Sequence, residues 1–553
     1  MPQAMKLLVI GGVAAGASCA ARARRLCETA EITVLERGPD VSFANCGLPY
    51  HVGGEIPTRD VLAVQTPATL KGLLNLDVRT RCEAVAIDRA GKRVEVKNLA
   101  DGSSAWLSYD KLMLSPGASP IRPPIPGIDD PRVFTLRSLE DMDRITAATE
   151  AGMRAVAIGA GFIGLEMAEQ LQRKGLSVEL VELQNQVLPQ LDAKMTMLLE
   201  SELRHHEIGL TLGDGIECFV PTADALECHL KSGKVLKADF VVLSMGVKPD
   251  TQIARDAGLT LGPRGHIVVD HFQRTSDPDI YAAGDAVETE ELVFGDRIAL
   301  PMGGPANRQG RVAADHMLRP ATAKPYPGSL GTAIVRVFEV AAGVTGWTEK
   351  RMRDANRPCA SVIVNDHQHA TYFPGAKPLT LKLVWDPLDG RVVGAQVTGS
   401  EGVDKRLDVI AASIRGKATI DDLCHLELAY APPFGSAKDI INIAGFAATN
   451  MRDGLFEQAG ELPFGNAQIV DVRPKPVADA FPLTGAINIP FPTLRANLDK
   501  LDRSRPVITV CAFGKMSYFA ARVLAQNGFD VKSYSGGIKG NIDPRSPAKL
   551  PTA

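Results

Sequence analysis

The sequence predicts an α/β fold that begins with two similar parallel-sheet domains and ends with a smaller α/β domain. Residues 6–36 read as an apolar strand, a glycine turn, a helix and a second strand, and residues 154–182 repeat this order. Such an order is typical of the βαβ unit of a parallel sheet. Near the C-terminus, short apolar segments alternate with helical ones, which indicates the small α/β domain.

Composition limits the classes of protein to be considered. The 553 residues suffice for about three or four domains. Because 45% of residues are hydrophobic and the net charge is only −3, neither disorder nor a nucleic-acid partner is indicated. No apolar run reaches the roughly 18 residues of a membrane helix. The nine cysteines lack CxxC or Cys/His ligand spacing, so we expect no metal, no disulfide framework and a reducing cytoplasm.

The second βαβ unit carries a dinucleotide-binding pattern. Gly159, Gly161 and Gly164 follow a strand and open a helix, and Glu182 ends the next strand. Glycines at these places permit a tight turn, close approach of a pyrophosphate and helix-to-strand packing. Glu182 would accept hydrogen bonds from a ribose and repel a 2′-phosphate, and no basic residue follows it directly. We therefore predict NADH rather than NADPH.

The first unit has a related turn at Gly11, Gly12 and Gly16, although Val13 stands where the pattern has its second glycine. Glu36 ends the following strand at the place of a ribose-binding carboxylate. In the later segment DIYAAGD, Asp285 ends a strand and can bind ribityl or phosphate groups of a flavin. Two dinucleotide sites in one chain imply FAD plus a pyridine nucleotide. The other predicted cofactor-binding residues are Arg37, Ser115 and Gly246.

Cys46 lies shortly after the first unit, in the run SFANCGLPY. No second cysteine follows at close spacing, and His51 stands where a paired dithiol would be completed. A lone thiol cannot store two electrons as an internal disulfide. It must pair with an external thiol, a persulfide sulfur or oxygen, which predicts single-cysteine redox chemistry on a flavin.

Several runs together carry a family resemblance. The two βαβ units, SFANCGLPY, LMLSPGASP, YAAGD and AYAPPFGSAKD resemble the single-cysteine flavin disulfide reductases, which have a glutathione-reductase-like fold. That family includes coenzyme A-disulfide reductases, NADH-dependent persulfide reductases and NADH oxidases. The C-terminal runs VDVR, GAINIP, VCAFGKMSYFAARVLAQNGF and SGG resemble a rhodanese domain. The combination resembles the fused coenzyme A-disulfide/persulfide reductase subgroup, whose expected cargo is sulfane sulfur.

The resemblance implies a domain organisation. We expect an FAD-binding domain at 1–115 and 250–325, an NAD(H)-binding domain at 116–249 and an α+β dimerisation domain at 326–452. Pro-rich stretches at 116–131 and 246–250 would be the crossings between the first two domains. A linker at 453–466 and a rhodanese-like domain at 467–553 complete the chain.

The resemblance also implies residue roles at the reductase site. Cys46 would face the flavin, and Ser42 and Asn45 would flank the coenzyme A pantetheine path. Tyr372 and Tyr430 match two tyrosines that the partner subunit of a homodimer contributes, whose hydroxyls hold the substrate sulfur or protonate a leaving thiolate. Position 434 is Phe, so no further hydroxyl is available there.

Basic residues at or near the family's coenzyme A contacts supply the positive charge that a polyphosphate needs. Each of them taken alone is also typical of a solvated surface. They are Arg22, Arg25, Lys71, Arg308 and Lys438.

The predicted rhodanese loop, Cys511 to Ser517, departs from its family. Many members have arginine where Met516 stands and glycine where Ser517 stands, and Lys515 supplies part of the lost charge. The usual Gly-His-Ile approach before GAINIP is replaced by Pro-Leu-Thr. In a rhodanese loop, converging backbone N–H groups and the following helix stabilise the cysteine thiolate. We expect Cys511 to carry sulfur; the alternative is a domain kept for binding or assembly.

The predicted activity is an FAD-dependent, NADH-driven reduction of coenzyme A persulfide, polysulfide or coenzyme A disulfide through Cys46. A first alternative is an NADH oxidase or peroxidase in which Cys46 cycles through a sulfenic acid. This alternative leaves the basic residues and the second sulfur domain unexplained. A second alternative is a flavin-based, redox-responsive binding protein whose rhodanese domain engages a partner.

Overall fold

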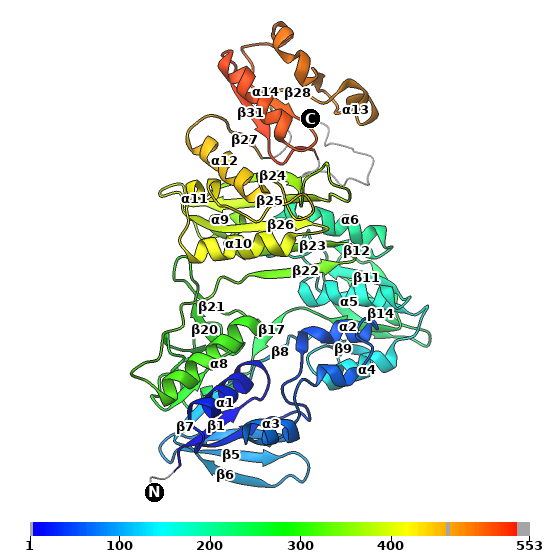
Figure 1. Ribbon diagram of the computed structural model, residues 1–553. Coiled ribbons are helices and arrows are strands. Elements are labelled where there is room, and N and C mark those ends of the chain that lie inside the picture. Colours follow the sequence, from blue (N-terminus) through cyan, green and yellow to red (C-terminus); the bar gives the residue numbers. More distant parts are fainter. Residues whose placement is uncertain (1–3, 461–464, 539–553) are drawn as a thin grey trace. The chain divides into compact units, whose positions relative to one another are not determined.

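The computed structural model describes residues 4–460 and 465–538, which form two compact units (Figure 1). The first unit holds the described residues up to Leu183 and those from Asp214 to Gly331. The second holds Gln184–Gly213 and the described residues from Thr332 onward. Parts of the predicted FAD-binding domain (1–3), linker (461–464) and rhodanese-like domain (539–553) lie outside the described residues.

The first sheet of unit 1 contains the first predicted βαβ element. Its strands are parallel and have the order β19-β7-β1-β2-β3. The bounds are Ile280–Ala282, Lys111–Leu114, Lys6–Ile10, Glu31–Leu35 and Asp77–Arg79. Helix α1 (Ala14–Leu26) buries small residues such as Ala20 and Ala23, so it packs closely on α8 (Gly303–Leu318). A Cβ added at Gly310 of α8 would lie 2.1 Å from the carbonyl oxygen of Ala15.

The second sheet of unit 1 contains the second βαβ element. Within this unit its parallel strands have the order β11-β10-β16-β9, with bounds Ser177–Glu182, Arg154–Ile158, Phe240–Leu243 and Val133–Thr135. Every residue of β16 is buried, as expected for a strand covered on both faces. Helix α5 (Phe162–Arg173) connects β10 to β11. The predicted pair of Rossmann-like sheets is therefore present.

The two Pro-rich crossings lie side by side. Strand β8 (Ala118–Pro120) pairs antiparallel with β17 (Val247–Pro249). Unit 1 also contains two three-stranded antiparallel sheets, β4-β5-β6 and β13-β14-β15. Their strands are Cys82–Asp88, Arg93–Asn98, Ser104–Ser108, Ile216–Pro221, Leu226–Leu230 and Val235–Ala238.

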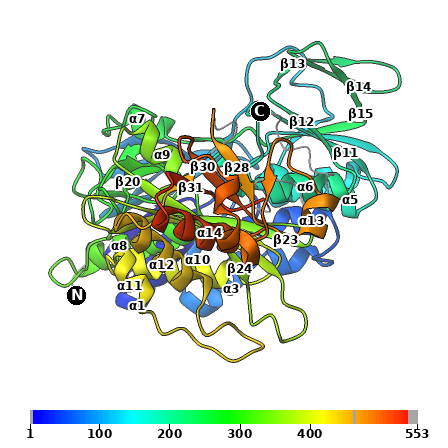
Figure 2. The ribbon, with the colours of Figure 1, turned by 90° about the horizontal axis from the view of Figure 1, so that it is seen from above.

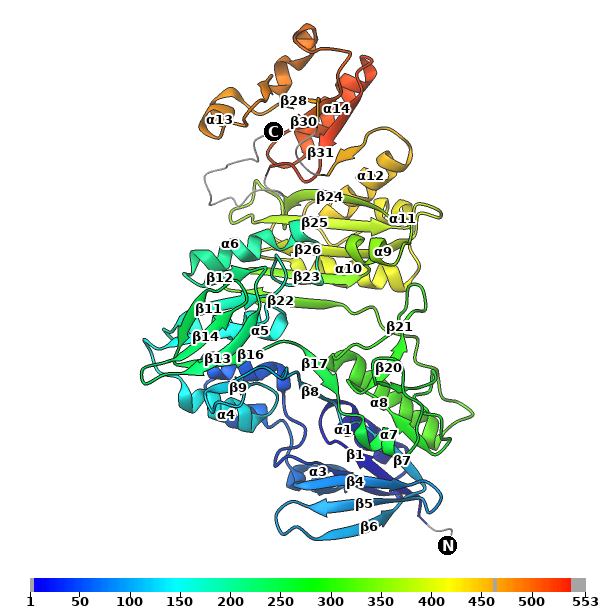
Figure 3. The ribbon, with the colours of Figure 1, turned by 180° about the vertical axis from the view of Figure 1, so that it is seen from behind.

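Unit 2 is built on a five-stranded antiparallel sheet with the order β22-β23-β26-β25-β24, beside which α10 (Val403–Arg415) lies (Figure 3). The strands are Ala333–Val337, Val340–Gly346, Val392–Gly399, Pro378–Trp385 and Ala360–His367. Strands β22 and β23 form a hairpin that turns at Phe338, whose φ is 51°. Phenylalanine is uncommon at positive φ and is not a residue that indicates a turn, so the sequence does not predict this hairpin.

A buried ion cluster joins the segment Gln184–Gly213 to this sheet. The Lys382 ammonium lies 2.7 Å from Asp192 and 2.6 Å from Glu349. Burial alone would raise the pKa values of both carboxyls, but Lys382 and further hydrogen bonds hold them below their usual range. A second buried pair, between Arg406 and Asp439 (2.6 Å), anchors helix α12 (Ile440–Arg452), which Asp439 caps.

The C-terminal sheet of unit 2 is parallel, with the order β27-β31-β30-β28-β29. Its strands are Gln458–Ala459, Val531–Tyr534, Val507–Val510, Gln468–Asp471 and Ile487–Asn488. Helix α14 (Lys515–Gln526) runs beside β30 and β31 (Figure 2). Strand β27 falls inside the predicted linker 453–466, so this sheet begins earlier in the chain than residue 467.

Among the helices of the described residues, none is both long and apolar enough to cross a membrane.

Candidate functional sites

The first glycine turn packs helix α1 directly on the backbone of β1. Gly11 has φ of +90°, and a Cβ added at Gly16 would lie 1.8 Å from the Gly11 carbonyl oxygen. The N–H of Gly12 donates to the Glu36 carboxylate at 2.8 Å. Helix α1 begins without a side-chain cap, so its N-terminal N–H groups are available for an anionic ligand.

The second turn repeats this geometry. Gly159 has φ of +98°, and a Cβ at Gly164 would lie 1.8 Å from the Gly159 carbonyl oxygen. The N–H of Ala160 donates to the buried Glu182 carboxylate at 2.7 Å. A Cβ at Gly161, in contrast, would meet no atom of the described residues within 4 Å. The packing of the chain itself therefore does not require glycine at 161. A ligand that approaches this backbone would explain why glycine stands there.

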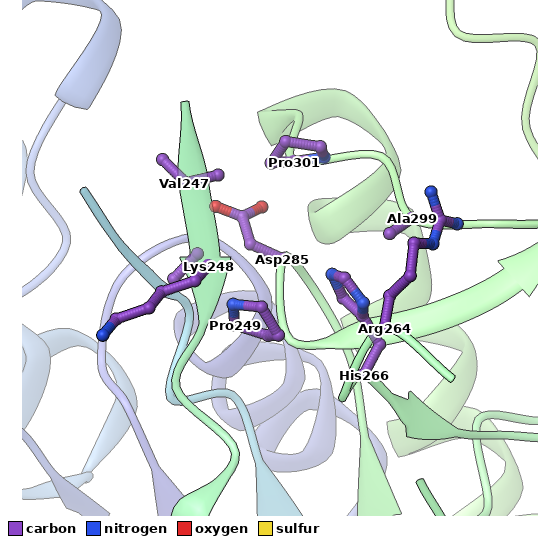
Figure 4. Close-up of a pocket in the computed structure, with 9 residues that line it drawn as sticks. Val247, Lys248, Pro249, Arg264, His266, Asp285, Ala299 and Pro301 are labelled. Carbon is purple, nitrogen blue, oxygen red and sulfur yellow. The ribbon is translucent and has the colours of Figure 1, made fainter. Parts of the chain in front are cut away.

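Asp285 lines a cavity of about 310 Å³ in unit 1, bounded by β17 on one side and by Arg264 and His266 on the other (Figure 4). Burial raises the pKa of its carboxyl, and Arg137 acts in the opposite direction. The Ser115 hydroxyl donates to the carbonyl of Ile10 at 2.7 Å and so holds the first glycine turn.

Two further predicted cofactor residues border these elements. Arg37 forms ion pairs with Asp250 (3.4 Å) and Glu83 (3.8 Å), and its side chain is half-exposed. Gly246 precedes β17 and has φ of +95°, a conformation that favours glycine.

Cys46 lies in a short 3-10 turn, Asn45–Gly47, directly before helix α2 (Leu48–Val52). The residue reaches the surface, yet neighbouring atoms partly desolvate its sulfur. This desolvation raises the pKa of the Cys46 thiol, and the carboxylates of Glu166 and Asp285 raise it further. The chain's own groups therefore favour the protonated thiol over the thiolate.

Glu166, on α5, is a neighbour of the Cys46 site that the sequence pattern does not predict. It accepts a hydrogen bond from the Tyr50 hydroxyl at 3.3 Å, which joins it to the helix that follows Cys46. It follows the glycine turn by only a few residues, but nothing in the sequence links that turn to Cys46. Only the packing of α2 on α5 brings these groups near one another.

The predicted coenzyme A residues stay predictions. Ser42 has φ of 51°, and Asn45 is exposed beside Cys46. Arg25, Arg308 and Lys438 are also exposed. The other two cations have partners in the chain: Arg22 lies 2.6 Å from Asp315, and Lys71 donates to Asn75 at 2.7 Å.

Tyr372 and Tyr430 of unit 2 are brought together from segments far apart in the chain. Their hydroxyl oxygens lie 2.8 Å apart, and this hydrogen bond raises the pKa of Tyr372. Tyr372 is 72% exposed, Tyr430 49% and the neighbouring Phe434 71%. Two hydrogen-bonded hydroxyls among exposed rings can donate a proton to a molecule that docks on this surface.

Cys511 occupies a loop that points two backbone donors at its sulfur. The N–H groups of Gly514 and Ser517 donate to Sγ, each at 3.2 Å. Gly514 has φ of +89° and caps α14, so the helix starts beside the sulfur. Gly537 packs on this loop, since a Cβ there would lie 2.5 Å from the Gly514 nitrogen. The predicted departures Met516 and Ser517 leave both donors in place.

Three family models match the chain. Pyridine nucleotide-disulphide oxidoreductase matches residues 5–309, its dimerisation domain matches residues 332–439, and a rhodanese-like domain matches residues 457–541. The third match includes β27, in agreement with the pairing of that strand.

Individual relatives agree with these matches. A coenzyme A disulfide reductase from Staphylococcus aureus (strain JH9) is 33% identical over 445 residues, which are 80% of this chain and 99% of the relative. The crystal structure of reduced Bacillus anthracis CoADR-RHD is 41% identical with a TM-score of 0.94, covering 97% of this chain and 98% of that one. An NAD-dependent persulfide reductase from A. fulgidus is 39% identical with a TM-score of 0.92, covering 97% of this chain and 100% of its own.

The open space at Gly161 generates a first prediction. In Gly161→Ala the added methyl has no atom within 4 Å in the part of the chain that the structure describes, so thermal stability should equal that of the wild type. Because the methyl would occupy the predicted path of a pyrophosphate, we expect the dissociation constant of NAD⁺, measured by calorimetry, to rise about fivefold or more. Gly164→Ala is the matched control: its methyl collides with Gly159 and should lower the melting temperature. Unchanged NAD⁺ affinity in Gly161→Ala would contradict the assignment.

The carboxylate beside Cys46 generates a second prediction. Removing its negative charge in Glu166→Gln should lower the pKa of Cys46, because the charge disfavours the thiolate. We expect iodoacetamide to alkylate Cys46 faster at pH 7.5, and the pH profile of this alkylation to move to lower pH. Peptide mass spectrometry measures the alkylation of Cys46. Asp285→Asn should act in the same direction with a smaller effect. Slower or unchanged alkylation in Glu166→Gln would show that this carboxylate does not act on the sulfur.

Proposed function

The chain belongs to the pyridine nucleotide-disulphide oxidoreductase family, and we propose that it is an FAD-dependent enzyme that uses NADH to reduce sulfur–sulfur bonds at Cys46. Its substrates would be coenzyme A persulfide, polysulfide and coenzyme A disulfide. The observation that carries the proposal is the combination of a lone Cys46, in the same unit as two dinucleotide turns, with a second sulfur site at Cys511. All nine cysteines of the chain are free thiols, so Cys46 has no partner for an internal disulfide.

The residues around the first turn fit FAD. Gly11, Gly12 and Gly16 form a tight turn in which Gly16 lies against the Gly11 carbonyl, and Glu36, at the ribose position, accepts from the Gly12 N–H. Asp285 and the cavity that it lines would bind the ribityl or phosphate groups of the cofactor. Bound FAD would supply a two-electron carrier between NADH and the sulfur of Cys46. NADH would bind at Gly159, Gly161 and Gly164, with Glu182 selecting its ribose.

The sulfur chemistry of Cys46 balances with one NADH for each bond reduced. The Cys46 thiolate attacks one sulfur of coenzyme A disulfide, the S–S bond breaks, and one coenzyme A thiolate leaves. Two electrons and two protons then convert the remaining mixed disulfide into a second coenzyme A thiol and the Cys46 thiol. With a persulfide, one NADH and one proton are consumed, and one thiol and one hydrogen sulfide are formed.

The tyrosine pair suggests how the departing sulfur receives its proton. Tyr372 and Tyr430 hydrogen-bond to each other on an exposed surface, where a second copy of the chain can dock. We infer that they serve the Cys46 of the partner in a homodimer, holding the substrate sulfur or protonating the leaving thiolate. The five proposed coenzyme A cations would bind its phosphates.

The rhodanese domain would supply sulfane sulfur. Cys511 would accept it and pass it to a coenzyme A carrier, and tethering of the two domains raises the effective concentration of that carrier. Nine free thiols favour a reducing compartment, which we propose to be the cytoplasm.

Substitution of the two cysteines tests this function. Anaerobic NADH consumption by FAD-loaded protein would be measured with coenzyme A persulfide, polysulfide and coenzyme A disulfide. We expect Cys46→Ser to lose essentially all turnover because the nucleophile is gone, while Cys218→Ser retains it. Cys511→Ser should keep coenzyme A disulfide reduction and lose the part of sulfur reduction that passes through the rhodanese domain. Wild-type NADH oxidation that requires oxygen and ignores every sulfur substrate would refute the proposal.

A further inference from the structure

One peptide group stands between the sulfur of Cys511 and a side chain outside its own domain. The Gly514 N–H, which donates to Cys511 Sγ at 3.2 Å, belongs to the same peptide as the Phe513 carbonyl. The side-chain amide of Asn365 donates to that carbonyl at 3.1 Å. Asn365 lies on β24, in the antiparallel sheet of the dimerisation domain.

We propose that Asn365 is a positioning residue for Cys511, acting through the peptide between Phe513 and Gly514. A peptide is planar, and its C=O and N–H point in opposite directions. A donor that holds the oxygen therefore aims the N–H at the sulfur. Hydrogen bonds in such a chain also polarise one another, which strengthens the N–H as a donor to a sulfur anion.

The local backbone needs this outside support. Gly514 has φ of +89°, and glycine adopts many backbone conformations at little cost. The peptide that precedes it can therefore rotate and turn its N–H away from the sulfur. A bond from the neighbouring sheet restricts that rotation.

Two further contacts show that Asn365 is itself held in place. Its amide also donates to the Gly536 carbonyl at 2.7 Å, next to the Gly537 that packs on the Cys511 loop. The Thr380 hydroxyl, on β25, donates to Asn365 Oδ1 at 2.6 Å. This leaves the NH₂ group of Asn365 to face the two carbonyls of the rhodanese domain.

The chemistry affected is the uptake of sulfur. In a balanced step, the Cys511 thiolate attacks the terminal sulfur of a persulfide RSSH, the S–S bond breaks, and RS⁻ leaves while Cys511 becomes a persulfide. The negative charge lies on Sγ before the transfer and leaves with RS⁻, so a correctly aimed N–H from Gly514 assists the attacking thiolate. This step rests on the proposed function, whereas the effect of Asn365 on the thiol itself does not.

The test compares variants with matched changes at the same contact between domains. In full-length, FAD-loaded protein, Asn365→Ala and Asn365→Asp remove the donors to the Phe513 carbonyl. Gln458→Ala is the control, because Gln458 also joins the two domains, through Ile363 and Ser535, but does not touch this peptide. Thr380→Val removes only the group that orients Asn365.

The readout is the pH profile of Cys511 alkylation by iodoacetamide, resolved by peptide mass spectrometry. Loss of one hydrogen bond predicts alkylation at pH 7.5 that is about threefold to tenfold slower in both Asn365 variants, with a profile moved to higher pH. Thr380→Val should show a smaller change in the same direction. Gln458→Ala should match the wild type, and coenzyme A disulfide reduction through Cys46 should be unchanged in all four variants.

Two results would overturn the proposal. The first is a Cys511 alkylation rate in Asn365→Asp equal to that of the wild type. The second is a decrease in Gln458→Ala as large as in the Asn365 variants, which would assign the effect to the contact between the domains and not to Asn365. Formation of the Cys511 persulfide from coenzyme A persulfide is measured in parallel. If wild type forms none while the alkylation profiles change as expected, Asn365 positions the sulfur and the sulfur-carrier role of Cys511 fails.

Discussion

Both dinucleotide turns depend on one backbone contact, the close approach of a helix glycine to the carbonyl oxygen of the glycine that opens the turn. Gly16 meets Gly11 in this way, and Gly164 meets Gly159. A methyl group at either helix position would collide with backbone, so each helix can start where it does only with glycine there. These starts place uncapped N–H groups beside Glu36 and Glu182. They also place Glu166, on the second helix, where it acts on Cys46.

The sequence was sufficient for what depends on local geometry. Glycine spacing, buried strands and terminal carboxylates predicted both Rossmann-like sheets, and the family matches confirm the oxidoreductase and rhodanese assignments. It was less informative where structure arises from distant contacts. The hairpin at Phe338 has no turn residue, and the pairing of β27 with β31 occurs inside a predicted linker. The effect of Glu166 on Cys46 likewise arises only when α2 packs on α5.

The two sulfur sites are controlled by opposite surroundings. Around Cys46 the chain supplies carboxylates and partial desolvation, which favour the thiol. Around Cys511 it supplies two backbone N–H donors, each 3.2 Å from Sγ, and the start of helix α14. This difference suits the proposed division of roles, in which Cys511 would hold sulfane sulfur and Cys46 would react beside the cofactor. Asn365 extends the control of Cys511 into the neighbouring domain.

In the proposed function, electrons from NADH cleave a sulfur–sulfur bond at Cys46. The most direct measurement is the anaerobic stoichiometry of FAD-loaded protein with a limiting amount of coenzyme A persulfide, counting NADH oxidised, sulfide released and thiol formed. We expect one sulfide and one coenzyme A thiol for each NADH oxidised. Oxidation of NADH without release of sulfide, or only after oxygen is admitted, would contradict it.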